Sequence, residues 1–405
     1  MKGAFALICL VVLTAGCAAT EQRPSTGDKL YEAVARGSAP ELAVIDARSQ
    51  AADRRLALGV PSADWTHVYS ILSTSLVDTD PQTGSIRNSM RLGDSFQLPA
   101  ATDNGLPGGL SPDGRWLVVE RVDAAPGSMP KATHMLLIDT SRFTVARKID
   151  LAGYFQFDAV SNNGTNLYLI QHLNAREYYV RLYDVPSNTL TENIVVDKSD
   201  GNQAMAGVRL SGIASPDGRW LFSMYVREHE SPFIHALSLD GPFAFCLDLP
   251  GAGYGGDPRE MNWSLAMAAD GSNLFAVNPS TGVVAMASTG ANDAPAIIRT
   301  AHISPAGAPG VAMHGTNAAA VNGRALVAGG PGGLVWIDTS TLAVSGRTVE
   351  GWRISTVGLS PDGKNVYAVS DSGRIAIVSM SSRAVTAMFD PSAGQPMALM
   401  RVASA

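Results

Sequence analysis

The densest group of side chains able to do chemistry is the run Arg227-Glu228-His229-Glu230. A second polar group, His172, Asn174, Arg176 and Glu177, lies about 50 residues earlier in the chain. Carboxylate oxygens and imidazole nitrogens bind divalent cations, and a bound cation polarises a lactone carbonyl or a phosphoester oxygen. A consecutive charged run is also the usual composition of a solvated loop. We interpret both groups as candidates for binding and predict no catalytic residue and no resident metal.

Other catalytic patterns are missing from the sequence. There is no Gly-x-Ser-x-Gly motif, and serine, histidine and aspartate do not occur together in a recognisable hydrolase context. Cys246 lies in an apolar run and is typical of a small buried hydrophobe rather than of a nucleophile. The glycine run at 329–333 is not followed by Lys and Ser or Thr, so it predicts tight turns and no phosphate loop. We expect no cofactor.

The elements that must position these residues are indicated by a repeated polar turn. Its clearest copies are Ser111-Pro112-Asp113-Gly114, Ser215-Pro216-Asp217-Gly218 and Ser360-Pro361-Asp362-Gly363, each followed by a short apolar run of strand length. Proline presets φ, aspartate caps the turn, and glycine supplies a positive φ. The pattern predicts a hairpin between two buried strands.

A second mark is an apolar strand that ends in aspartate and small polar residues. It occurs as Ile138-Asp139-Thr140-Ser141 and Ile337-Asp338-Thr339-Ser340, at the place expected for the hairpin between the third and fourth strands of a unit. Two marks in a fixed order, recurring at about 50 residues, predict a β-propeller of four-stranded antiparallel blades.

Seven units are predicted from the first mark, and we expect a seven-bladed propeller over residues 41–405. The turns lie near Pro61, Gly114, Gly164, Gly218, Gly271, Gly323 and Gly363. Strand-like runs at 42–46 and 55–59, and another at 396–402, belong to no complete unit. We expect the two ends of the domain to pair and close the ring. If these runs form a full unit, the ring has eight blades.

Loops between second and third strands, and loops between blades, should share one face of the ring. Long ordered loops on a rigid scaffold are where binding residues are commonly placed. The candidate binding face carries these residues: Glu120, Asp123, His172, Arg176, Glu177, Arg227, Glu228, His229 and Arg259. Arg259 belongs to an aromatic and basic group at blade junctions that includes Arg209, Tyr254 and Trp263.

The N-terminal residues predict where the protein is located. Lys2 precedes an apolar stretch too short to span a bilayer, which indicates a secretory signal at residues 1–17. Leu13-Thr14-Ala15-Gly16-Cys17 resembles a bacterial lipobox, which implies lipidation of Cys17. Residues 18–40 are rich in small and polar side chains and are expected to form a flexible tether with a helix-like patch at 29–35. We therefore expect an extracytoplasmic protein, lipid-anchored to the cell membrane or outer membrane.

Composition and charge argue against a disordered chain and against a nucleic-acid-binding protein. Only 16% of the residues are charged and 46% are hydrophobic, which indicates a globular protein and excludes disorder as the main state. The formal net charge of −6, without a basic cluster, argues against nucleic-acid binding. With Cys9 in the signal and Cys17 as the anchor, Cys246 is the one cysteine left in the body, so no intramolecular disulfide is expected.

The repeated turns and the Asp-Thr hairpins resemble those of bacterial propellers of the YVTN, TolB-like and lactonase-like groups, and more loosely WD repeats. The resemblance covers nearly all of residues 41–405. It implies a fold, and it places any functional site at one mouth of the central channel. Two functions follow as expectations. The first is a non-catalytic module that binds a protein, peptide or envelope polymer on one face of the ring; the alternative is a metal-assisted, lactonase-like hydrolase with its site at the channel mouth.

Overall fold

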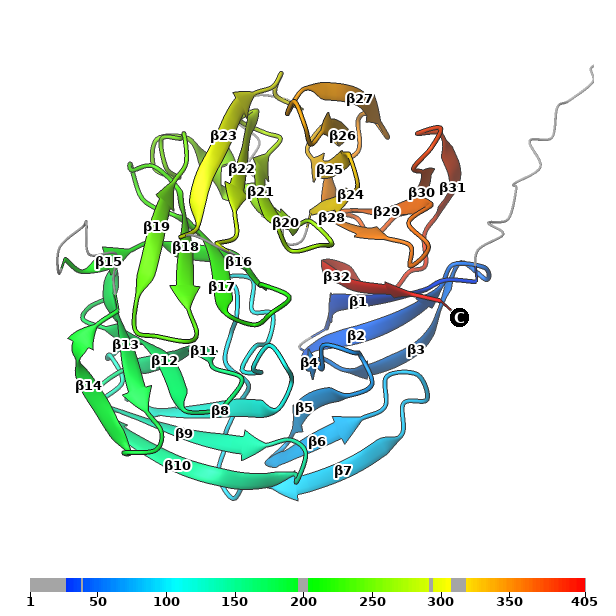
Figure 1. The fold of residues 1–405 in the computed structure, drawn as a ribbon. Coiled ribbons are helices and arrows are strands. Elements are labelled where there is room, and N and C mark those ends of the chain that lie inside the picture. Colours follow the sequence, from blue (N-terminus) through cyan, green and yellow to red (C-terminus); the bar gives the residue numbers. More distant parts are fainter. Residues whose placement is uncertain (1–26, 38, 196–202, 291–293, 307–317, 405) are drawn as a thin grey trace, which may run out of the picture.

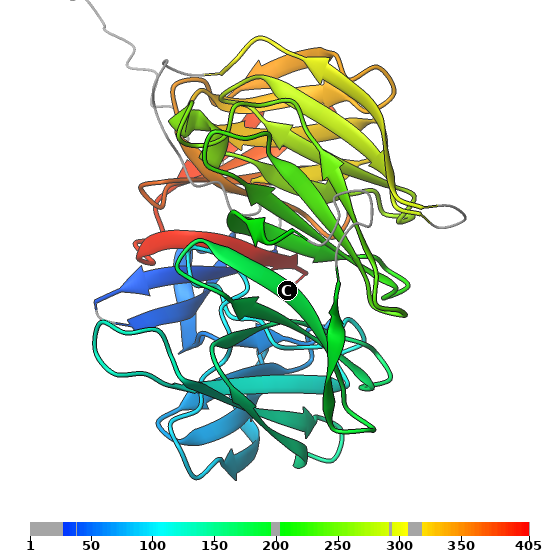
Figure 2. The ribbon, with the colours of Figure 1, turned by 90° about the vertical axis from the view of Figure 1, so that its left-hand side faces the viewer.

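The computed structural model describes residues 27–37, 39–195, 203–290, 294–306 and 318–404. Cys17 and the predicted signal therefore lie outside the described residues. Eight antiparallel sheets are arranged as blades around a central axis, so the chain is an eight-bladed β-propeller (Figure 1). Figure 2 shows the same sheets from the side. In the described part of the chain, no helix is long and apolar enough to span a membrane.

The first four blades have these strands. Blade 1 contains β1 (Lys29–Arg36), β2 (Ala39–Asp46), β3 (Ala51–Ala57) and the C-terminal β32 (Gln395–Ala403). Blade 2 contains β4 (Val60–Pro61), β5 (Val68–Leu72), β6 (Ser75–Thr79) and β7 (Ile86–Arg91). Blade 3 contains β8 (Trp116–Asp123), β9 (Ala132–Asp139) and β10 (Thr144–Ala152). Blade 4 contains β11 (Phe155–Val160), β12 (Asn166–His172), β13 (Glu177–Asp184) and β14 (Thr189–Ile194), with β15 (Met205–Ala206) paired to β13.

The other four blades are regular. Blade 5 contains β16 (Val208–Ala214), β17 (Trp220–Val226), β18 (Phe233–Ser238) and β19 (Ala244–Asp248). Blade 6 follows the 3₁₀ helix η2 (Pro258–Met261) and contains β20 (Ser264–Met267), β21 (Asn273–Asn278), β22 (Val283–Ser288) and β23 (Ala296–His302). Blade 7 contains β24 (Ala319–Asn322), β25 (Ala325–Gly330), β26 (Gly333–Asp338) and β27 (Val344–Thr348). Blade 8 contains β28 (Ile354–Leu359), β29 (Asn365–Ser370), β30 (Ile375–Ser379) and β31 (Val385–Phe389).

The expectation of seven blades is wrong, and the eight-bladed alternative is confirmed. Six of the seven predicted turns join the first and second strands of a blade, and the turn near Gly114 leads into β8 of blade 3, where the inner strand is irregular. Blade 1 has no such turn, because its inner strand β32 comes from the C-terminal end of the domain and pairs antiparallel with β1. The expected pairing of the two ends is therefore confirmed. A count based on turns misses the blade that closes the ring.

The predicted start of the propeller also needs correction. Residues 29–36 form strand β1, not a helix-like patch in a tether, and β1 pairs with β2 and with β32. The strand is buried on both faces from Leu30 to Val34 because it is the second strand of a blade. Its alanines and its glutamate favour a helix over a strand in the sequence, which is why the pattern did not indicate a strand.

The core is a ring of inter-blade clusters. Each pair of neighbouring blades in the described chain shares one group of buried side chains, for example Leu30, Ile45, Tyr367 and Ile377 between blades 1 and 8. Second and third strands are mostly buried, whereas outer strands such as β10 alternate between exposed and partly buried residues. Each blade thus depends on its neighbours for burial of its apolar faces.

The repeated turn has the same geometry in its three clearest copies. In blades 3, 5 and 8 the serine hydroxyl donates to the aspartate carboxylate two residues on, and the backbone N–H five residues on donates to the serine Oγ. The glycine of each turn has a positive φ, +78° at Gly114 and +70° at Gly218. The predicted chemistry of the turn is confirmed.

Candidate functional site

The candidate loops share one face of the ring. In an antiparallel meander, the connection from the second to the third strand and the connection to the next blade lie at the same end of the sheet. This end carries the β8–β9, β12–β13 and β17–β18 loops and the segment 249–263 before blade 6. We call it the loop face, and the end with the serine-containing turns the turn face.

Blades 4 and 5 are joined at the loop face by an ion pair. Arg176 Nη1 lies 3.3 Å from Glu228 Oε2, and the two side chains are 80% and 42% exposed. The predicted contact between these two loops is therefore present. Because both groups are exposed, the pair contributes little stability, and its main consequence is a charged surface continuous across two blades.

Arg227 is held against blade 5. It pairs with Glu230 at 3.4 Å and with Asp248 at 3.1 Å, donates from Nε to the carbonyl of Ser231, and lies over the ring of Phe233. These contacts fix the base of the 227–232 loop. The Arg227 carbonyl in turn accepts a hydrogen bond from the N–H of Tyr254 in the segment before blade 6.

The two candidate histidines have different surroundings. His172 is partly buried, stacks on Tyr154 with ring centroids 4.3 Å apart, and contacts Gln156 Oε1 at 2.6 Å; burial lowers its pKa. His229 is exposed, has a φ of +60°, and lies against Gly255, where an added Cβ would be 2.7 Å from its Nε2. His172 is thus a packing residue under the loop, and His229 covers the next loop.

The acidic candidates have separate partners. Asp123 pairs with Arg121 and His134, Glu177 accepts from Asn174, and both oxygens of Asp257 are bonded to Arg259. The hydrogen bond from His134 is the main cause that lowers the pKa of Asp123. Among the described residues, no group of three or more His, Cys, Asp and Glu side chains is placed to hold a metal ion. The carboxylates of the hydrolase alternative therefore do not converge in the described chain.

Glu120 is not on the loop surface. It is 5% exposed, and its Oε2 accepts a hydrogen bond from the backbone N–H of Phe157 at 3.0 Å. Burial raises its pKa to about 7, although the bond from Phe157 and the charge of Arg209 oppose the shift. It lies on β8 and contacts β11 of blade 4, whereas the sequence placed it in the loop after the strand; β8 in fact continues to Asp123.

Cys246 lies on β19 and is partly exposed, not fully buried. Its side chain packs against the apolar cluster between blades 4 and 5. This agrees with a packing role and corrects the expected degree of burial.

The channel beside blade 3 has a structure that no sequence pattern predicted. Blade 3 lacks a regular inner strand, and residues 92–115 contact β8 through isolated bridges at Gln97 and Leu110. Pro99, Pro107 and Pro112 interrupt this segment, and proline cannot donate to a ladder. The part from 99 to 108 folds back on itself, with Ala101 N–H donating to Leu106 and Gly108 N–H donating to Pro99. We call it the channel hairpin.

The channel hairpin reaches across the centre of the ring. Its Asp103 N–H donates to the carbonyl of Arg209 in blade 5, and Asn104 Nδ2 lies 3.5 Å from the carbonyl of Met397 in blade 1. Leu106 is buried in a small cluster with Ala33 and Ala398 of blade 1. The hairpin therefore links blade 3 to blades on both sides of the axis.

An ion pair is buried beneath the channel hairpin. Arg209 Nη1 lies 2.7 Å from Asp158 Oδ1, and the side chains are 12% and 1% exposed. Asp158 is at the bulge of β11, where Phe157 pairs with Leu169 and Ala159 with Tyr168. The bulge turns the carboxylate inward. Burial of such a pair is costly unless its remaining atoms are also satisfied.

Comparisons with known proteins support the fold. No protein-family model matches the chain, and no curated protein sequence is significantly similar to it. The structure of apo AztD from Citrobacter koseri is similar at a TM-score of 0.57 and 11% identity, covering 94% of this chain and 98% of that one. Dihydro-heme d1 dehydrogenase NirN in complex with DHE is similar at a TM-score of 0.53 and 15% identity, covering 91% and 74%. The periplasmic gluconolactonase PpgL of Pseudomonas aeruginosa has a TM-score of 0.45 and 18% identity, covering 91% and 97%. At these identities the likeness to AztD and NirN concerns the fold alone.

Proposed function

We propose that this protein is a non-catalytic, lipid-anchored extracytoplasmic propeller that binds a protein, peptide or envelope polymer on its loop face. The observation that carries the proposal is the joining of exposed loops from neighbouring blades through Arg176 and Glu228. The same face exposes two large apolar side chains, Met129 at 41% and Leu173 at 39%. Arginine and exposed apolar groups on one rigid face are typical of surfaces that recognise macromolecules.

The hydrolase alternative is not favoured by the described residues. It needs several carboxylates, amides or imidazoles at ligand distance from one point, and the candidates are instead bonded to separate partners. A direct assay still distinguishes the two functions. Turnover of a sugar lactone that requires added Ca²⁺, Mg²⁺ or Zn²⁺ and is abolished by a chelator would favour the hydrolase.

Binding on the loop face is tested by capture with matched variants. Immobilised full chain is incubated with envelope extract in parallel with the double variant Arg176→Glu/Leu173→Asp and with Lys364→Glu. Lys364 is 79% exposed in a serine-containing turn, so Lys364→Glu reverses one positive charge on the turn face, opposite the proposed site. We expect the captured species to be retained by the wild type and by Lys364→Glu and reduced at least about tenfold by the double variant. Equal capture by all three proteins would contradict a site on the loop face.

The anchor is tested separately. The lipobox-like sequence leads us to propose that Cys17 carries the lipid. Metabolic labelling with an alkyne fatty acid should tag the wild type and leave Cys17→Ser unlabelled. Label that persists in Cys17→Ser would remove the anchor from the proposal without affecting the loop face.

A further inference from the structure

A cavity lies in the central channel beside the irregular blade 3. Its volume is about 390 Å³, within the range of pockets that hold small molecules. It runs from Thr102 and Arg209 under the channel hairpin to Ala63 and Pro112 at the turn face. Its lining includes the exposed Ala63 at the turn-face end and Thr102 of the channel hairpin at the other end.

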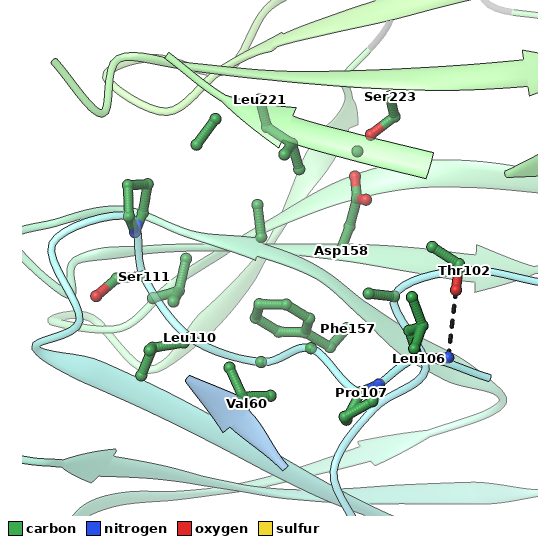
Figure 3. Close-up of a pocket in the computed structure, with 18 of the residues that line it drawn as sticks. Val60, Thr102, Leu106, Pro107, Leu110, Ser111, Phe157, Asp158, Leu221 and Ser223 are labelled. Carbon is green, nitrogen blue, oxygen red and sulfur yellow. Dashed lines mark hydrogen bonds between the residues drawn. The ribbon is translucent and has the colours of Figure 1, made fainter. Parts of the chain in front are cut away.

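Most of the cavity wall is apolar. Figure 3 shows Val60, Leu106, Leu110, Phe157 and Leu221 around it. The space exists because residues 98–110 do not form the inner strand that would otherwise fill this sector of blade 3. Gly109 allows the chain to pass close to β8 on this irregular path, since an added Cβ there would lie 2.5 Å from the carbonyl oxygen of Val118.

One polar atom in the wall has no partner. Asp158 Oδ1 is bonded to Arg209, but Asp158 Oδ2 is buried and accepts no hydrogen bond in the described chain. The side chain is 1% exposed, and its carboxylate points across the cavity toward β17, which carries Leu221 and Ser223 (Figure 3). A buried carboxylate oxygen without a donor is costly, so a bound molecule with an N–H or O–H group in this position would be stabilised.

The charge of the ligand follows from the ion pair. Arg209 already neutralises Asp158 at 2.7 Å. A cationic or anionic ligand would bring a second, unbalanced charge into an apolar wall, which is unfavourable. A neutral donor satisfies Oδ2 without adding charge.

We propose that this cavity binds a small uncharged molecule with an apolar ring system and one hydroxyl or N–H group, which donates to Asp158 Oδ2. The site is separate from the loop face and does not depend on the function proposed for it. A cavity of about 150 Å³ holds benzene, so about 390 Å³ accommodates a two-ring molecule. Binding at the channel would add a second ligand class, small and apolar, to a macromolecular binding surface.

The test uses two probes that differ by one donor. 2-Naphthol carries a hydroxyl group, and 2-methoxynaphthalene has the same ring system with the donor replaced by an ether. Both are titrated into the purified full chain by calorimetry. We expect saturable binding of one 2-naphthol per chain, about tenfold or more tighter than 2-methoxynaphthalene. Equal affinities would overturn the role of Asp158, and no saturable binding of either probe would overturn the site.

A variant that fills the cavity locates the bound probe. Gly212 lines the cavity, and a Cβ added there meets Ser223 Oγ at 3.5 Å and Leu221 Cδ1 at 3.7 Å, which are ordinary contacts. Gly212→Leu should weaken 2-naphthol binding at least about tenfold, whereas Gly212→Ala should change it less than about threefold. Undiminished binding in a folded Gly212→Leu protein would place the probe elsewhere and overturn the proposal. If Gly212→Leu does not fold, the comparison of the two probes on the wild type still decides it.

Discussion

Glu32 carries a buried carboxyl group. It is 1% exposed on β1, and its Oε1 accepts no hydrogen bond from the described residues. Its neighbours Leu30 and Val34 on the same face pack against Tyr367 and Ile375 of blade 8. Burial raises the pKa of Glu32 from 4.5 to about 8. The folded protein therefore holds a proton that the unfolded chain releases near pH 4.5.

This shift predicts a pH-dependent effect of Glu32→Gln. Because the folded-state pKa is raised, the stability linked to protonation is complete below pH 4.5 and is lost as the pH rises through about 8. Glutamine keeps the neutral form at every pH. Relative to the wild type, the variant should gain about 4 kcal/mol in unfolding free energy between pH 5 and pH 9. Urea unfolding at both pH values measures it, with Glu350→Gln, at an exposed position, as control. An equal change in both variants would contradict a pKa of Glu32 raised by burial.

His134, on the surface of blade 3, also has a raised pKa, but here the charged form is the one that the fold stabilises. Its Nδ1 lies 2.5 Å from Asp150 Oδ1 and its Nε2 lies 3.0 Å from Asp123 Oδ2, and these two bonds raise its pKa. The resulting stability is present below about pH 6.5 and is lost as the pH rises through the folded-state pKa.

His134→Gln should therefore destabilise the protein more at pH 5.5 than at pH 8.5. Since Asp150 is 75% exposed, solvent screening limits the difference to about 1 kcal/mol or less. Thermal unfolding at the two pH values detects it, and His302→Gln, an exposed histidine on β23, is the control. A loss that does not vary with pH would mean that the imidazole acts only by packing.

At this scale the sequence predicted part of the site. The charged loops of blades 4 and 5 were recognisable because Arg227-Glu228-His229-Glu230 and Arg176-Glu177 stand out from the apolar strands around them, and Arg176 does meet Glu228. Asp158 was not recognisable, because it is one acidic residue inside the apolar strand Phe155–Val160 and faces inward only through a bulge. Its partner Arg209 is 51 residues away, so no local spacing pattern joins the two.

At the scale of elements, the serine-containing turns connect neighbouring blades as well as neighbouring strands. The turn glycine of blade 4, Gly164, lies against the indole of Trp116 in blade 3, and Trp116 Nε1 donates to the carbonyl of Asn162 in the same turn. A Cβ at Gly164 would lie 2.4 Å from the indole Cε2. The corresponding Gly323 of blade 7 has no atom within 4 Å of such a Cβ.

These two glycines give a matched pair of substitutions. Both have positive φ, +70° at Gly164 and +55° at Gly323, so alanine costs about 1 kcal/mol of backbone strain at either position. Gly164→Ala must also displace the indole of Trp116, which should raise its total cost to about 3 kcal/mol. Equilibrium unfolding in urea measures the difference. Equal destabilisation by the two variants would show that the contact between blades 3 and 4 contributes nothing beyond backbone geometry.

The repeated turns also explain what could be predicted of the elements. The hydrogen bonds of serine and aspartate and the positive φ of glycine are local features, so the seven turns and the strands that follow them were predicted from their sequence. The channel hairpin, which takes the place of a regular inner strand in blade 3, could not be predicted. Pro99, Pro107 and Pro112 give this segment a loop-like composition, and its path depends on distant contacts with Arg209 and Met397. The same applies to β1, whose strand character comes from pairing with residues at the other end of the chain.

For the whole molecule, closure of the ring depends on β32. It pairs with β1 from Lys29–Ala403 to Ala35–Gln395, and the register shifts twice along the way. Its Leu399 is 4% exposed, packs between blades 8 and 1, and donates its N–H to Thr356 Oγ1 on β28. One strand from the end of the domain therefore contacts the blades on both sides of the seam.

Leu399→Ala tests whether this seam stabilises the entire ring or only blade 1. Removing a buried leucine should cost about 3 kcal/mol of unfolding free energy. Met388→Ala, at a side chain that is 53% exposed on β31, should change it by less than about 0.5 kcal/mol.

The same variant shows whether the ring unfolds as one unit. Because every blade buries its faces against two neighbours, opening the seam exposes blades 8 and 1 and leaves the remaining blades without closure. We therefore expect Leu399→Ala to shift the whole transition. Trp65 contacts Tyr31 of blade 1 and Trp352 lies in the cluster between blades 7 and 8, so tryptophan fluorescence reports on both sides of the seam. It also reports on distant blades through Trp116 and Trp220, and far-UV circular dichroism reports on all strands. Coincident single transitions with lowered midpoints would support a ring that unfolds as one unit; a separate early fluorescence transition, found in Leu399→Ala and not in Met388→Ala, would mean that the seam opens before the rest of the ring.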